Sequence, residues 1–167
     1  MSHVKNKVDW CLKKASKERD KRGRHRGLMR VNPDIKNARK HIEKSEHYLN
    51  ATLFLEKEFS DISISTVFYS VYHSLLAIVS KFGYESGNQE CTFALIYSLI
   101  EDGKIDLEKE ILDKISSLEL GEESVISLRE RYQYGVELSM KKEIFEENLK
   151  IAKKLLGKVK EIIEDEK

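Results

Sequence analysis

The side chains with the clearest capacity for chemistry form a basic segment, KERDKRGRHRGLMR, at residues 17–30. It holds seven lysines and arginines against two acids, about +5, in a chain of net charge +1. Guanidinium groups pair well with phosphate oxygens, so Arg22, Arg24 and Arg26 are candidates for a phosphate-binding arm. The two glycines of the segment predict a flexible loop rather than a helix. The alternative is a solvated connector, or a loop neutralised by acidic surface elsewhere in the chain.

Tyrosines and a histidine form a second candidate group within apolar helical patterns. Tyr69, Tyr72, Tyr132 and Tyr134 could stack a nucleobase, and the imidazole of His73 can titrate near neutral pH. Each residue also has a structural explanation. Tyrosines at helical spacing pack in a core or at a dimer interface, and His73 could be a core-edge histidine bonded to a backbone or tyrosine partner.

The remaining polar candidates are weaker. Asn88 stands at the expected start of a helix, where it could bond a ligand or simply cap the helix. His41 and His47 are six residues apart and do not share a helix face, which argues against a metal pair. We expect no metal and no cofactor.

Composition limits the class of protein. A chain of 167 residues with 35% charged residues and one proline suits one domain of long solvated helices. The near-zero net charge argues against binding of polyanions by the whole chain, so any basic surface must be local. No apolar run approaches ~18 residues and the start of the chain has no apolar core, so we expect neither a membrane span nor a signal peptide. Cys11 and Cys91 are far apart in sequence and are interpreted as buried or free thiols of a cytoplasmic protein.

Hydrophobic periodicity predicts the elements that must position these side chains. The stretch from Ile62 to Phe82 is apolar on more than half of its circumference, which predicts a central helix with partners on several sides. The other expected helices cover residues 3–18, 34–57, 89–101, 106–119, 122–138 and 141–164. Trp10 is expected to anchor the first of these helices on the bundle.

These patterns predict an all-α protein, a helical bundle with one additional N-terminal helix. We assign residues 1–33 to the N-terminal helix and basic loop, and residues 34–167 to the bundle.

Two motifs resemble those of the HEPN domain family. Residues 67–74, VFYSVYHS, resemble the family pattern A-x-Y-A-M-F/Y-H-A that opens its central helix. Residues 128–135, LRERYQYG, resemble the later R-x-x-A-D-Y-G form, with Arg129, Gln133 and Tyr134 at the arginine, acidic and tyrosine positions. The resemblance covers about residues 34–160, and the N-terminal helix and basic loop lie outside it.

The resemblance implies an up-and-down bundle of four or five core helices that forms a homodimer, with a groove where the two motif helices meet. It implies nucleotide or RNA binding, and membership in toxin–antitoxin pairs whose other half is a nucleotidyltransferase-like protein. Tyr69, His73, Asn88, Arg129 and Arg131, together with Tyr134, are then the candidate binding residues.

The chain departs from the ribonuclease members of the family at Tyr134, which stands where they carry histidine. A phenol with a pKa near ~10 is a poor base at neutral pH, so His73 would have to supply the imidazole for metal-free RNA cleavage. Arg129 could hold a phosphate, or could form an outward ion pair with Glu130 or Glu122. Three hypotheses follow: a non-catalytic nucleotide- or RNA-binding module, a metal-independent endoribonuclease toxin, and a structural or adaptor homodimer.

Overall fold

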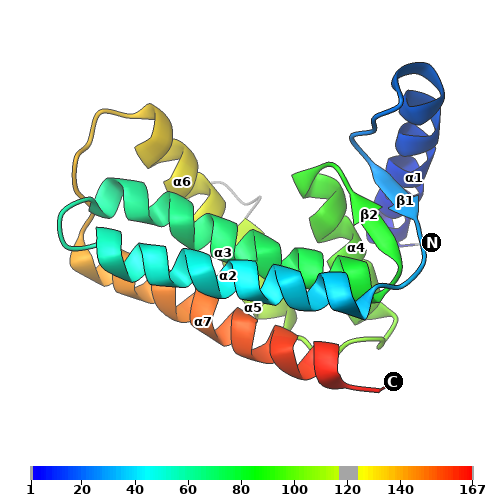
Figure 1. Ribbon diagram of the computed structural model, residues 1–167. Helices are drawn as coiled ribbons and strands as arrows, with labels where there is room; N and C mark the ends of the chain where they lie inside the picture. Colours follow the sequence, from blue (N-terminus) through cyan, green and yellow to red (C-terminus); the bar gives the residue numbers. More distant parts are fainter. Residues whose placement is uncertain (1, 117–123, 167) are drawn as a thin grey trace.

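The computed structural model describes residues 2–116 and 124–166, without the side chain of Arg22. Three long helices, α2 (Ile35–Leu55), α3 (Ser60–Lys81) and α7 (Lys142–Glu164), lie side by side and form the body of the molecule (Figure 1). The shorter helices α4 (Gln89–Glu101), α5 (Lys109–Ser116) and α6 (Val125–Tyr134) pack around this body. The predicted all-α bundle is confirmed.

Helix α3 is the centre of the bundle, because it packs against α2, α4, α6 and α7. Its apolar stripe, including Val67, Val71, Leu75 and Ile78, is fully buried. By length and composition alone α3 could cross a membrane, but 61% of its apolar window is buried inside the molecule, as in the core helix of a soluble protein. The breadth of its apolar surface is therefore explained by its many neighbours.

Helices α2 and α3 are joined by a short turn and run antiparallel, as the sequence predicts. Hydroxyl groups line the seam between them. The Ser45 hydroxyl donates to the backbone carbonyl of Ser70 at 2.8 Å and lies 2.9 Å from the Ser74 hydroxyl. All three serines are buried, and small side chains of this kind let two helix backbones approach closely.

The N-terminal part of the chain differs from its prediction. Helix α1 (His3–Arg22) continues beyond residue 18 into the basic segment and ends where Gly23 adopts a φ of 65°. Residues Leu28–Arg30 then form strand β1, which pairs antiparallel with strand β2 (Tyr84–Ser86). The expected flexible loop is therefore mostly helix and strand, and only residues 23–27 connect the two.

Close backbone contact explains why this segment is held in place rather than flexible. A Cβ atom on Gly27 would lie 2.2 Å from the carbonyl oxygen of Cys11, so only glycine lets the chain pass so near α1. Leu28, the next residue, is fully buried. Residues 2–33 thus contact the rest of the molecule through the strand pair and through packing of α1 on α4.

A disulfide bond joins Cys11 of α1 to Cys91 of α4, with the two Cα atoms 5.8 Å apart. The interpretation of these cysteines as free thiols is wrong, although both residues are buried as expected. The sequence separation of 80 residues hid the pairing, since only the packing of α1 on α4 brings the two side chains together.

Smaller differences concern Trp10 and the ends of two elements. Trp10 does not anchor α1, because its side chain is 48% exposed and lies beneath the ammonium groups of Lys7 and Lys14. Helix α6 ends at Tyr134 rather than near residue 138, and Val136 beyond it is exposed. The expected helix boundaries between residues 117 and 123 lie outside the described residues.

We predict that the disulfide stabilises the fold mainly by fixing α1. The buried residues of α1 are Val8, Cys11 and Ala15, all small, and the bond joins positions 80 residues apart. Reduction should therefore lower the free energy of unfolding by about 2 to 4 kcal/mol. Urea unfolding of the oxidised protein, with and without a phosphine reductant, measures this difference.

A Cys11→Ser/Cys91→Ser double variant is the matched control, and its stability should not respond to the reductant. Two reactive thiols in protein purified and denatured without reductant would contradict the prediction.

Candidate functional site

His73 meets a second histidine across the seam between α2 and α3. Its Nδ1 lies 2.9 Å from Nδ1 of His41, so one imidazole donates a hydrogen bond and the other accepts it. The ring of His73 also stacks on Tyr48 of α2, with ring centroids 5.6 Å apart and planes 18° apart. His73 is thus bonded at a core edge, although its partner is a histidine rather than a backbone group.

Tyr69 extends this arrangement along the seam. Its ring lies 5.2 Å from that of Tyr48, and it is 38% exposed. His41, His73, Tyr48 and Tyr69 therefore follow one another along the seam, alternating between α2 and α3, and each is at least partly exposed. We call these four residues the aromatic row.

Antiparallel packing accounts for the aromatic row. Residues at equal distances from the α2–α3 turn face one another, which pairs His41 with His73 and Tyr48 with Tyr69. Sequence reasoning missed His41 and Tyr48 because it examined each helix face separately. The sequence did carry a signal. The two rings on α2 are seven positions apart and the two on α3 are four positions apart, so each pair shares one helix face, and the short turn brings the two helices together.

The environment of the aromatic row disfavours positive charge on its imidazoles. Burial, then the neighbouring His41 and Lys44, lower the pKa of His73 from 6.5 to about 4. Burial also lowers the pKa of His41. The ammonium of the exposed Lys44 lies 5.2 Å from the centroid of the Tyr48 ring.

Arg129 of α6 approaches the same helix from another side. Its Cζ atom lies 4.2 Å from the centroid of the Phe68 ring, and its side chain is only 17% exposed. One guanidinium nitrogen is 3.7 Å from the Glu130 carboxylate, and the buried Nε has no hydrogen-bond partner among the described residues. The alternative partner Glu122 lies outside the described residues. Phe68, which also contacts Tyr69 edge to face at 5.5 Å, separates Arg129 from the aromatic row.

The other residues of the second motif point elsewhere. Arg131 lies 3.7 Å from the Glu137 carboxylate and over the ring of Tyr132. Tyr134 ends α6 with its side chain 78% exposed. A surface cavity of about 370 Å³ lies beside this end of α6, and its lining contains neither Tyr134 nor Arg129 nor His73. The monomer therefore does not place the three candidate catalytic side chains around this cavity.

Asn88 acts as a helix cap. Its side-chain oxygen accepts a hydrogen bond from the backbone N–H of Cys91 at 3.1 Å, at the start of α4. This hydrogen bond occupies the amide oxygen that could have bound a ligand. Helix capping alone therefore accounts for an asparagine at this position.

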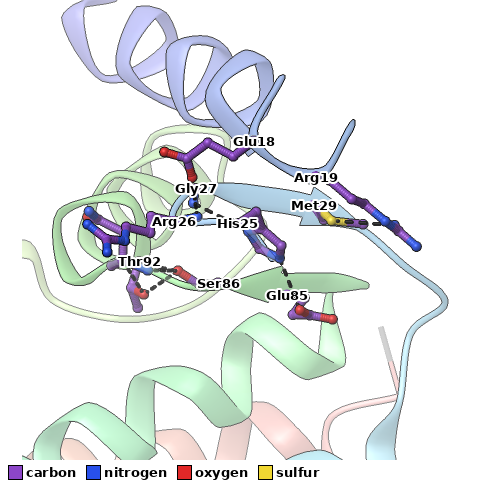
Figure 2. Close-up of polar contacts among 10 residues, drawn as sticks. Glu18, Arg19, His25, Arg26, Gly27, Met29, Glu85, Ser86 and Thr92 are labelled. Carbon is purple, nitrogen blue, oxygen red and sulfur yellow. Dashed lines mark hydrogen bonds and ion pairs between the residues drawn. The ribbon is translucent and has the colours of Figure 1, made fainter. Parts of the chain in front are cut away.

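The basic segment is held by acidic side chains on two sides (Figure 2). The carboxylate of Glu18 accepts a hydrogen bond from the backbone N–H of Arg26 at 2.6 Å. His25, in the connection before β1, pairs with Glu85 of β2 at 3.0 Å. The side chains of Arg24 and Arg26 are exposed, and no ion pair occupies their guanidinium groups within the described part of the chain. Arg22 has no described side chain.

The geometry favours stacking over proton transfer. An imidazole with a pKa near 4 is a weak base at neutral pH, and Nδ1 of His73 is already occupied by His41. The two imidazoles and two phenols of the row are flat, partly exposed groups of the kind on which nucleobases stack. A comparison of the chain with protein-family models and with curated proteins finds no match.

We predict that His73 stays neutral well below neutral pH. Its folded pKa lies below its unfolded value near 6.5, so the unfolded chain binds the proton first. Stability should be unaffected by this group above about pH 6.5 and should fall as the pH drops from 6.5 toward 4. Carbon-detected NMR titration of the histidine rings, together with urea unfolding at pH 7.5 and 5.5, measures both effects.

His41→Gln provides the control, because removing the neighbouring imidazole should raise the pKa of His73 toward 6.5. A His73 that titrates near 6.5 in the unaltered protein would overturn this account of the pair.

Proposed function

We propose that this chain is a HEPN-like helical module that binds nucleotides or single-stranded RNA without cleaving them. The observation that carries the proposal is the aromatic row, a continuous series of partly exposed rings along one helix seam. Successive bases stack on such rings, and each stacked base contributes about 1 to 3 kcal/mol of binding free energy.

Charge around the row supports the same ligand class. Lys44 lies over the Tyr48 ring on the exposed side of α2, where an ammonium can meet a backbone phosphate. The neutral state of His73 avoids a desolvation penalty when a base covers it. Binding of RNA to the row then depends on base stacking more than on charge, so the affinity for RNA should depend only weakly on salt concentration.

The same features argue against the ribonuclease alternative. Metal-free cleavage needs a base that removes the 2′-hydroxyl proton, and His73 has the low pKa and the occupied Nδ1 described above. As a binding module the chain would serve as one half of a toxin–antitoxin-type pair, with a nucleotidyltransferase-like protein as its partner.

A cytoplasmic location is part of this proposal, and the disulfide sets a condition on it. Disulfides are rare in the cytoplasm of mesophiles but frequent in intracellular proteins of hyperthermophiles. The proposal therefore requires a cytoplasm in which the Cys11–Cys91 bond persists.

A homodimer is the second candidate, and exposed apolar side chains at one end of the bundle favour it. The cavity of about 370 Å³ between the start of α3 and the segment after α6 is lined in part by Ile62, Val136 and Leu138, all exposed. Phe54 and Phe59 are exposed at the α2–α3 turn, at the same end (Figure 1). Burial of such a surface against a second copy would remove it from water.

Tyr69→Ala should weaken binding of a single-stranded RNA oligonucleotide at least fivefold, because one stacking ring is lost. Fluorescence anisotropy at two salt concentrations measures the affinity, and circular dichroism checks that the variant is folded. Tyr134→Ala is the matched control, since this tyrosine is exposed but lies outside the aromatic row. Equal affinity of the protein and Tyr69→Ala, or no binding at millimolar RNA, would refute the proposed function.

Leu138→Lys should convert a dimer to a monomer in sedimentation at micromolar concentration, because it places a charge on the exposed apolar surface. Lys142→Glu, a charge change on α7 that removes no apolar group, should leave the dimer intact. A monomeric unaltered protein would exclude the homodimer.

A further inference from the structure

A second surface cavity, of about 230 Å³, lies between α1 and β1 in the part of the chain outside the HEPN-like region. One wall is a single face of α1, because Leu12, Ser16 and Arg19 follow one another at helical spacing. The other wall is strand β1, from Leu28 to Arg30. Asp20 also lines the cavity.

The two arginines of this cavity have only weak partners. A nitrogen of the Arg19 guanidinium lies 3.5 Å from the thioether sulfur of Met29, which is a poor hydrogen-bond acceptor (Figure 2). The guanidinium carbon of Arg30 lies 5.3 Å from the centroid of the Tyr84 ring. Both guanidinium groups thus keep most of their N–H donors for another acceptor.

Two nearby acids, Glu18 and Glu85, are engaged elsewhere, whereas Asp20 lines the cavity itself. Figure 2 shows Glu18 and Arg19 leaving α1 in different directions, with the Glu18 carboxylate bonded to the backbone N–H of Arg26. Glu85 pairs with His25. Within the described residues, no carboxylate forms an ion pair with Arg19 or Arg30, and both arginines line the cavity.

The rest of the lining defines the ligand class. Leu12 and Met29, which are partly exposed, provide apolar surface in the lining, and the hydroxyl of Ser16 is one further donor. Asp20 disfavours a densely charged polyanion but can accept hydrogen bonds from ligand hydroxyl groups. We infer that this cavity binds a phosphate monoester with a flat apolar body and hydroxyl groups, of the nucleoside monophosphate class. This site is independent of the aromatic row and does not rest on the proposed function.

The test is isothermal titration calorimetry of the oxidised full chain with adenosine monophosphate, inorganic phosphate and adenosine as separate probes. We expect the monophosphate to bind more tightly than either part alone. Arg19→Gln and Arg30→Gln should each weaken it about tenfold, as should Ser16→Phe, which fills the cavity. Arg24→Gln, an exposed arginine of the same segment that does not line the cavity, should leave the affinity unchanged.

Tyr69→Ala separates this site from the aromatic row. Unchanged affinity for the monophosphate in Tyr69→Ala, combined with loss in Arg19→Gln, supports the inference even if RNA binding fails. Absence of binding at millimolar monophosphate would overturn it. So would equal losses in Arg24→Gln and Arg19→Gln, or equal affinities for inorganic phosphate and the monophosphate.

Discussion

The contact between α2 and α3 is the constraint on which the rest of the structure depends. Buried serine hydroxyls at positions 45, 70 and 74 bond to one another and to the backbone, so the seam carries polar groups that are satisfied within it. Small side chains there permit close approach of the two backbones, and the short turn sets which residues face each other. The other face of α3 is then left for α4, α6 and α7.

The same contact creates the chemistry of the aromatic row. The serines fill the buried side of the α2–α3 contact. The larger rings lie along its outer edge and stack on one another. Partial burial and a nearby lysine keep His73 uncharged, so a residue type often associated with proton transfer becomes a flat neutral surface. Helix packing, rather than a special local sequence, therefore lowers the pKa of the imidazole at this position.

The N-terminal segment adds a second surface of different character. The disulfide and the close approach of Gly27 fix α1 and β1 against α4 and β2, although the fully or nearly buried apolar residues of α1 are only Val8, Cys11 and Ala15. Basic residues that would be solvated in a free loop are then held on a helix and a strand. Arginines from both elements face one cavity, which neither element could form alone.

The sequence by itself determined the helical class, most helix positions and the burial of the α3 stripe, because these follow from local periodicity that each helix carries in its own residues. Tertiary structure decided which faces meet. The bond between Cys11 and Cys91, the short strand pair and the meeting of His41 with His73 join residues 80, 56 and 32 positions apart, and nothing local encodes such pairings. The position of Arg129 on Phe68 depends in the same way on how α6 lies on α3, which is a property of the packed core rather than of either helix.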